Sequence, residues 1–95
     1  MASITAKITG SFVKAVFFER AHGEDNFDRH DMTDISGTWQ TDPFDLPTGD
    51  YDSKYIVLTG PGAQYNSEIA GATPASKQTG TVPRDGEIIG GFSVA

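Results

Sequence analysis

The chain contains no cysteine, and only two leucines and two methionines stand among its 95 residues. The absence of cysteine excludes disulfide bonds, thiol catalysis and thiolate metal sites. No apolar run approaches the roughly 20 residues of a membrane-spanning helix. The first residues, Met1 to Lys7, also lack the basic start and apolar core of a signal peptide.

Basic residues are scarce as well, with 7 Lys and Arg against 13 Asp and Glu, so the formal net charge is −6. The Lys and Arg residues are scattered along the chain. Nucleic-acid binding needs clustered basic side chains that displace phosphate counterions, and anionic membranes attract the same kind of cluster. We therefore expect neither nucleic acid nor membrane as a partner, and we expect the acidity to favour solubility.

The residues that are abundant favour strands. The chain has 7 Ile, 5 Val and 10 Thr, and β-branched side chains fit a pleated sheet better than a helix. Its 11 Gly and 5 Pro divide it into short segments. The composition therefore predicts short strands that are joined by turns.

Hydrophobic patterning places these strands. Ile4, Ala6 and Ile8 alternate with polar residues, which predicts a half-buried strand. Further strands are predicted within 12–19, 35–46 and 51–59, the last ending at Gly60-Pro61-Gly62, and a short one is possible at 64–69. Residues 71–78 read as a loop, and 81–82 with 87–94 read as a hairpin around Pro83-Arg84-Asp85-Gly86. We expect one all-β domain over residues 1–95, an antiparallel sandwich of six to seven strands.

Two neighbouring segments carry a family resemblance: Ser36-Gly37-Thr38-Trp39 and Phe44-Asp45-Leu46-Pro47-Thr48-Gly49-Asp50-Tyr51. Together they resemble the "G-x-W/F … L-P-x-G-x-Y" passage of bacterial and phage immunoglobulin-like or transthyretin-like (carboxypeptidase-regulatory-like) domains. The resemblance covers about a quarter of the chain. It implies a β-sandwich used for adhesion, spacing or assembly, and it does not imply catalysis.

Residues 20–34 form a long acidic stretch with few apolar side chains, which predicts a polar loop. The candidate calcium ligands in it are Asp25, Asp28 and Asp31, since Ca²⁺ prefers carboxylate and carbonyl oxygens. Their spacing does not match an EF-hand loop. The simpler interpretation is a solvated loop without metal. His22 and His30 match no zinc-ligand spacing, so we interpret them as surface histidines.

The aromatic residues have two interpretations. Trp39, Tyr51, Tyr55 and Tyr65 would suit a sugar-stacking platform or a protein interface, and they would equally suit a small core. We assign Trp39 to the core and expect Tyr65 to be exposed, because its neighbours in the sequence are polar. Phe92 and Val94 join Tyr65 as candidate interaction residues, because the apolar C-terminal strand could pair with the sheet edge of another subunit.

No catalytic motif is present: the sequence has neither a Gly-x-Ser-x-Gly elbow nor a Gly-Lys-Ser/Thr phosphate loop. We expect no enzyme activity and no cofactor apart from the calcium alternative. Small size and acidity favour a structural subunit that docks on a larger homo- or hetero-oligomeric particle, of the phage decoration or tail-accessory type. The alternative is a carbohydrate- or protein-binding module of a bacterial surface protein. The localisation stays open, with a virion or a cell surface favoured.

Overall fold

A computed structural model describes residues 1–60 and 62–95, so Pro61 of the predicted Gly60-Pro61-Gly62 turn lies outside the described residues. The described residues form nine strands and no helix. The strands are β1 (Ala2–Thr9), β2 (Lys14–Ala21), β3 (Asp28–Ile35), β4 (Thr38–Thr41), β5 (Phe44–Leu46), β6 (Gly49–Leu58), β7 (Gln64–Ala70), β8 (Ser76–Thr81) and β9 (Glu87–Val94). In this part of the chain, no helix is long and apolar enough to cross a membrane.

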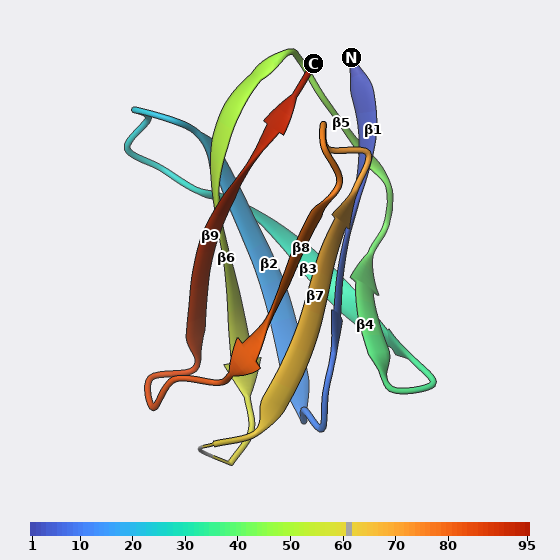
Figure 1. The fold of residues 1–95 in the computed structure, drawn as a ribbon, viewed down its shortest axis with the longest axis vertical. Helices are drawn as coiled ribbons and strands as arrows, with labels where there is room; N and C mark the ends of the chain where they lie inside the picture. Colours follow the sequence, from blue (N-terminus) through green and yellow to red (C-terminus); the bar gives the residue numbers. More distant parts are fainter. Residues whose placement is uncertain (61) are drawn as a thin grey trace.

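The strands pair antiparallel in the order β8-β7-β1-β4-β3-β2-β6-β9, and β5 pairs with the first residues of β1. The fold is all-β, as expected. It is, however, a nearly closed barrel of nine strands, whereas the expectation was a sandwich of six to seven. The difference arises at β3, whose first half pairs with β2 and whose second half pairs with β4, so that one continuous run of strands rolls around the core (Figure 1).

The predicted loop over residues 20–34 is wrong for most of its length. β2 continues to Ala21 and β3 begins at Asp28, so only residues 22–27 connect them. β3 consists mostly of polar residues, and Met32 is its one buried side chain. Its backbone is nevertheless paired on both sides, and these main-chain hydrogen bonds hold a strand that contributes little to the core.

The prediction of a C-terminal hairpin is also wrong. The turn over residues 83–86 forms, with Gly86 N–H donating to Pro83 O at 3.0 Å and Gly86 at φ +74°. However, the turn does not join two paired strands. β8 pairs with β7, whereas β9 pairs with β6 at the other end of the strand order. β8 also occupies residues that read as a loop.

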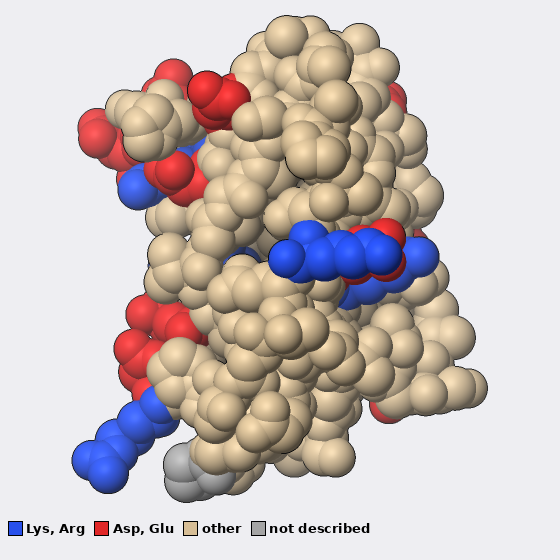
Figure 2. All heavy atoms as spheres, in the orientation of Figure 1, with Lys and Arg blue, Asp and Glu red and all other residues tan. Residues whose placement is uncertain are grey.

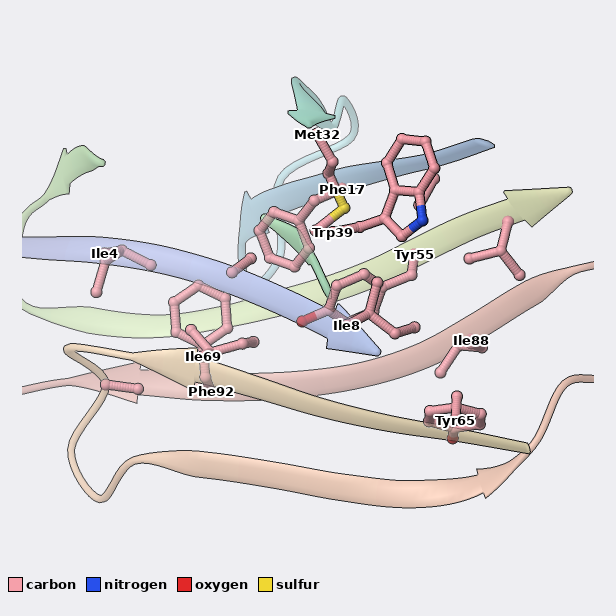
Figure 3. Packing of buried hydrophobic residues seen from close by; sticks show 14 of the residues in the cluster. Ile4, Ile8, Phe17, Met32, Trp39, Tyr55, Tyr65, Ile69, Ile88 and Phe92 are labelled. Carbon is pink, nitrogen blue, oxygen red and sulfur yellow. The ribbon is translucent and has the colours of Figure 1, made fainter. Parts of the chain in front are cut away.

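The core contains the side chains that alternation predicted for β1, and Ile4, Ile8 and Phe17 are fully buried in it (Figure 3). Trp39 lies in the same cluster, which confirms its assignment to the core. The Phe17 ring contacts Tyr55 across the β2–β6 pair, with 5.0 Å between the ring centroids. The Tyr55 hydroxyl reaches β1 and donates to Lys7 O at 3.1 Å, so the core aromatics tie strands from both sides of the barrel.

Candidate functional site

The three candidate calcium ligands do not converge. Asp25 lies exposed in the connection between β2 and β3. Asp28 and Asp31 both belong to β3, and their side chains point to opposite faces because they are three positions apart in a strand. Asp31 pairs instead with Arg29, at 2.9 Å between Nε and Oδ1.

No alternative metal site replaces this one within residues 1–60 and 62–95. No group of three or more His, Asp or Glu side chains there is arranged to hold a metal ion. A loop would have let the three aspartates turn toward one ion. The extended backbone of β3 keeps two of them apart, so we take the calcium interpretation no further.

The three predicted interaction residues are buried. Tyr65 is only 7% exposed, so the expectation that it lies on the surface is wrong. Its ring faces the core and its hydroxyl accepts a hydrogen bond from Gln78 Nε2 at 3.0 Å. Phe92 and Val94 also face inward, and Phe92 stacks on Tyr51 with 5.2 Å between centroids. Sequence neighbours misled the assignment because alternate residues of a strand point to opposite faces.

The four aromatic residues proposed as a stacking platform fail for the same reason. Trp39, Tyr51 and Tyr55 are buried together with Tyr65 in the core. Burial raises the pKa of the Tyr55 hydroxyl above its usual range. Recognition of sugars by stacking on these rings is therefore excluded in this fold.

Exposed apolar residues gather instead on the outer face of β2, β6 and β9. We call this surface the apolar face, and it consists of the exposed Leu58 and Ile89, the half-buried Phe18 and Ile56, and the buried Val16 between them. Leu58 and Ile89 are 61% and 64% exposed, and Val13 is 74% exposed. The pairing register sets Val16 beside Ile56 on adjacent strands, and Val13, which precedes β2, lies next to Leu58 because its N–H donates to Leu58 O. Contiguous exposed apolar surface is typical of interaction sites.

Charged side chains border this surface, and Lys54 crosses it between Phe18 and Ile89. Lys54 pairs with Glu87 at 3.7 Å, and its Nζ lies 5.4 Å from the centre of the Phe18 ring. Four of the seven basic residues and four acids lie on the outer sides of β2, β3, β6 and β9: Lys14, Arg20, Arg29 and Lys54 face Asp31, Asp50, Asp52 and Glu87. Four positive charges against four negative ones leave this side without net charge, whereas the whole chain carries −6.

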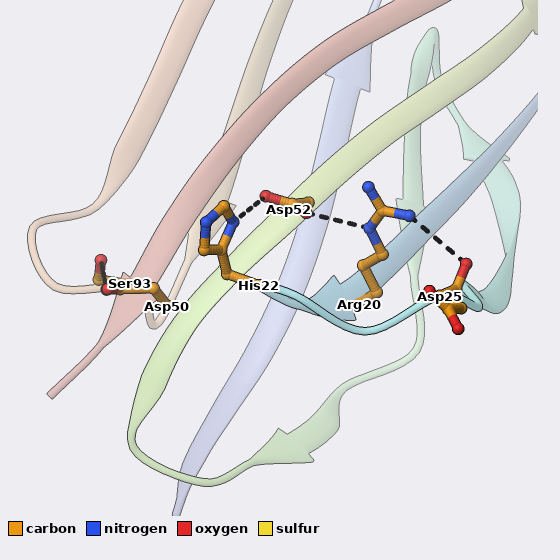
Figure 4. A network of polar contacts seen from close by, with 6 residues as sticks. All are labelled: Arg20, His22, Asp25, Asp50, Asp52 and Ser93. Carbon is orange, nitrogen blue, oxygen red and sulfur yellow. Dashed lines mark hydrogen bonds and ion pairs between the residues drawn. The ribbon is translucent and has the colours of Figure 1, made fainter.

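A polar network borders the same side (Figure 4). Asp52 accepts a hydrogen bond from Arg20 Nε at 3.0 Å and lies 3.0 Å from His22 Nδ1. The hydrogen bond to Asp52 raises the pKa of His22, and the contacts with His22 and Arg20 lower the pKa of Asp52. All three groups are accessible to water, so the network orders the surface more than it stabilises the fold.

The opposite side of the barrel carries a shallow polar groove of about 560 Å³ over β1, β4, β7 and β8. The pairing register lines up Lys77, Glu68, Lys7 and Gln40 across the four strands. Figure 2 shows Lys or Arg groups beside acidic ones at the middle of this side, within a largely uncharged surface. The groove presents hydrogen-bond donors and acceptors but no aromatic ring.

The carboxylate of Glu19 lies inside the barrel. Glu19 is 3% exposed, and its Oε2 lies 2.8 Å from His30 Nε2. The His30 ring stacks on Phe44, with 3.8 Å between the centroids. The interpretation of His30 as a surface histidine is therefore wrong. The alternation Ala15, Phe17, Glu19 was the signal that could have placed Glu19 on the inner face.

Comparisons with protein-family models, curated proteins and solved structures give no significant match. The resemblance to immunoglobulin-like or transthyretin-like domains therefore extends to an all-β antiparallel architecture and no further.

Proposed function

We propose that this chain is a non-enzymatic assembly subunit that docks through its apolar face on a larger protein particle. A phage virion, with the chain as a decoration or tail-accessory protein, is the setting that we propose for it. The observation that carries the proposal is the exposure of Leu58 and Ile89 on one side of the barrel. Burying these side chains against a partner would remove apolar surface from water, which favours association.

The charge distribution also supports docking through the apolar face. The outer sides of β2, β3 and β6 are close to neutral, so the remaining surface carries most of the negative charge. Charge depletion at the centre of a patch and polar groups at its rim are typical of protein interfaces. A docked subunit would therefore place its apolar face on the particle and leave acidic surface toward the solvent.

The proposal predicts a strong effect of charge at the centre of the apolar face. Leu58→Lys is expected to weaken docking by about tenfold or more, since burying one Leu side chain contributes about 1.5–3 kcal/mol. Gradient sedimentation of particles from cells that encode the chain, followed by quantitative mass spectrometry, measures the bound copy number. Thr9→Lys, which adds the same charge on the groove side, should bind as the parent chain does. If the parent chain does not sediment with any particle, the docking proposal fails.

The polar groove favours carbohydrate binding as a second candidate function. Its lysine, glutamate and amide side chains, with Asn66 among them, match the hydroxyl and carboxylate groups of an acidic saccharide. Titration with neutral and uronic-acid oligosaccharides by calorimetry tests this candidate. Binding that is lost in Glu68→Ala and kept in Asp85→Ala, a substitution outside the groove, would support it. The absence of heat with both saccharide classes would exclude them as ligands.

A further inference from the structure

The free edge of β9 has hydrogen-bonding groups that point away from the barrel. Val57 N–H donates to Gly86 O at 3.0 Å, which fixes the alternation of main-chain bonds between β6 and β9. By this alternation, residues 88, 90 and 92 bond to β6, whereas residues 87, 89, 91 and 93 face the free edge. A hydrogen bond from Thr73 N–H to Ser93 O, at 2.8 Å, confirms that the main-chain groups of residue 93 face the edge away from β6.

Two residues at the middle of this edge are left open. Within residues 1–60 and 62–95, β6 is the one strand that pairs with β9. Glu87 N–H is taken by Asp85 Oδ1 at 3.0 Å, and Ser93 O is taken by Thr73. The N–H and C=O groups of Ile89 and Gly91 remain open, whereas Thr73 occupies the edge beside Ser93.

The usual protection of an edge strand is weak here. Natural edges are blunted by charged side chains, proline or bulges. Ile89 is 64% exposed, Gly91 is exposed, and the Gly90-Gly91 pair brings no side chain that would keep another backbone away. The edge strand at the other end of the order, β8, carries the exposed Lys77 in contrast.

We propose that this edge pairs with the same edge of a second copy, antiparallel and around a twofold axis at Gly90. The open groups are symmetric about that residue. Ile89 then meets Gly91 of the second copy and exchanges both main-chain hydrogen bonds with it. Beyond these residues the two strands diverge, because Thr73 already occupies the edge beside Ser93 O.

The side chains fit this register. Ile89 lies opposite Gly91 of the second copy on the outer side, where no side chain competes for the space. The pairing joins the two β6–β9 sheets and brings both apolar faces onto one continuous surface. The inference thus deepens the proposed assembly function and depends on it for its biological purpose.

The test is the mass in solution as a function of concentration. Sedimentation equilibrium of the parent chain is expected to show a mass that rises from 10.1 kDa toward twice that value. Because each copy carries −6, added salt should increase association by screening repulsion. Ile89→Pro should stay monomeric, since proline removes an outward N–H without losing a bond to β6.

The controls separate this inference from the docking proposal. Leu58→Lys, which impairs docking, should dimerise as the parent chain does, and Ile89→Ala should keep more association than Ile89→Pro. If Ile89→Pro does not fold, amide exchange on the parent chain decides, because Ile89 and Gly91 should become protected as concentration rises. A parent chain that is monomeric throughout, unprotected amides, or an Ile89→Pro dimer would each overturn the pairing and leave docking untouched.

Discussion

Replacement of Phe17 by alanine is expected to lower the free energy of unfolding by about 3–5 kcal/mol, the typical range for a buried aromatic ring. Phe17 is fully buried, and its ring packs against Tyr55 and Phe44 at centroid distances of 5.0 and 6.2 Å. Tyr55 and Phe44 lie in the paired strands β6 and β5, which limits how far they can move into the vacated space. The total stability of a domain is about 5–15 kcal/mol, so the variant would lose a large part of it.

Phe18 supplies the matched control for this prediction. It is the same residue type one position later, and it points to the outer side beside Lys54. Phe18→Ala should lower stability by about 1 kcal/mol, since it loses a partly exposed ring and a cation–π contact. Urea denaturation followed by circular dichroism measures both variants. Equal losses at the two positions would contradict the inward and outward alternation of β2.

His30→Ala is expected to lower the free energy of unfolding by about 3 kcal/mol, because it leaves the buried Glu19 without its partner. The substitution removes the 2.8 Å contact between His30 Nε2 and Glu19 Oε2 and the stacking of His30 on Phe44. Removing one member of a buried polar pair is costly because the other keeps its desolvation penalty. Thermal or urea unfolding at neutral pH measures the loss.

Two further variants identify the origin of this effect. Glu19→Gln combined with His30→Ala should recover part of the loss, since a neutral amide is easier to bury than a carboxylate. His22→Ala removes the other histidine, whose partner Asp52 keeps its bond to Arg20, and should change stability little. A double variant as unstable as His30→Ala alone would assign the loss to packing on Phe44.

Alternation within a strand was readable from the sequence. The inward positions of β1 and the two faces of β6 follow from apolar residues at every second position, and Trp39 belongs to the core. β3 could not be predicted from the sequence, because it has almost no apolar side chains. It forms through main-chain hydrogen bonds with β2 and β4. The calcium interpretation depended on the predicted loop, and in the strand that forms instead the side chains of Asp28 and Asp31 point to opposite faces.

The pairing of the C-terminal strands was also predicted wrongly, because strands that are close in the sequence were expected to pair with each other. The turn at residues 83–86 was predicted from its own residues, but such local chemistry does not say which strand each arm will pair with. β9 pairs with β6 through eight register positions, and this pairing leaves its outer edge free. The open edge and the apolar face both follow from this arrangement, and neither can be read from residues 87–94 alone.

The amino-acid sequence alone determined the all-β class, the alternation of β1 and β6 and the turn at 83–86, because each depends on side chains close together in the chain. Only the tertiary structure decided the strand order, the burial of Tyr65 and the Glu19–His30 pair, and the position of Leu58 and Ile89 on one outer side. These features depend on hydrogen bonds and contacts between distant segments, and main-chain groups that make such bonds are the same in every residue except proline.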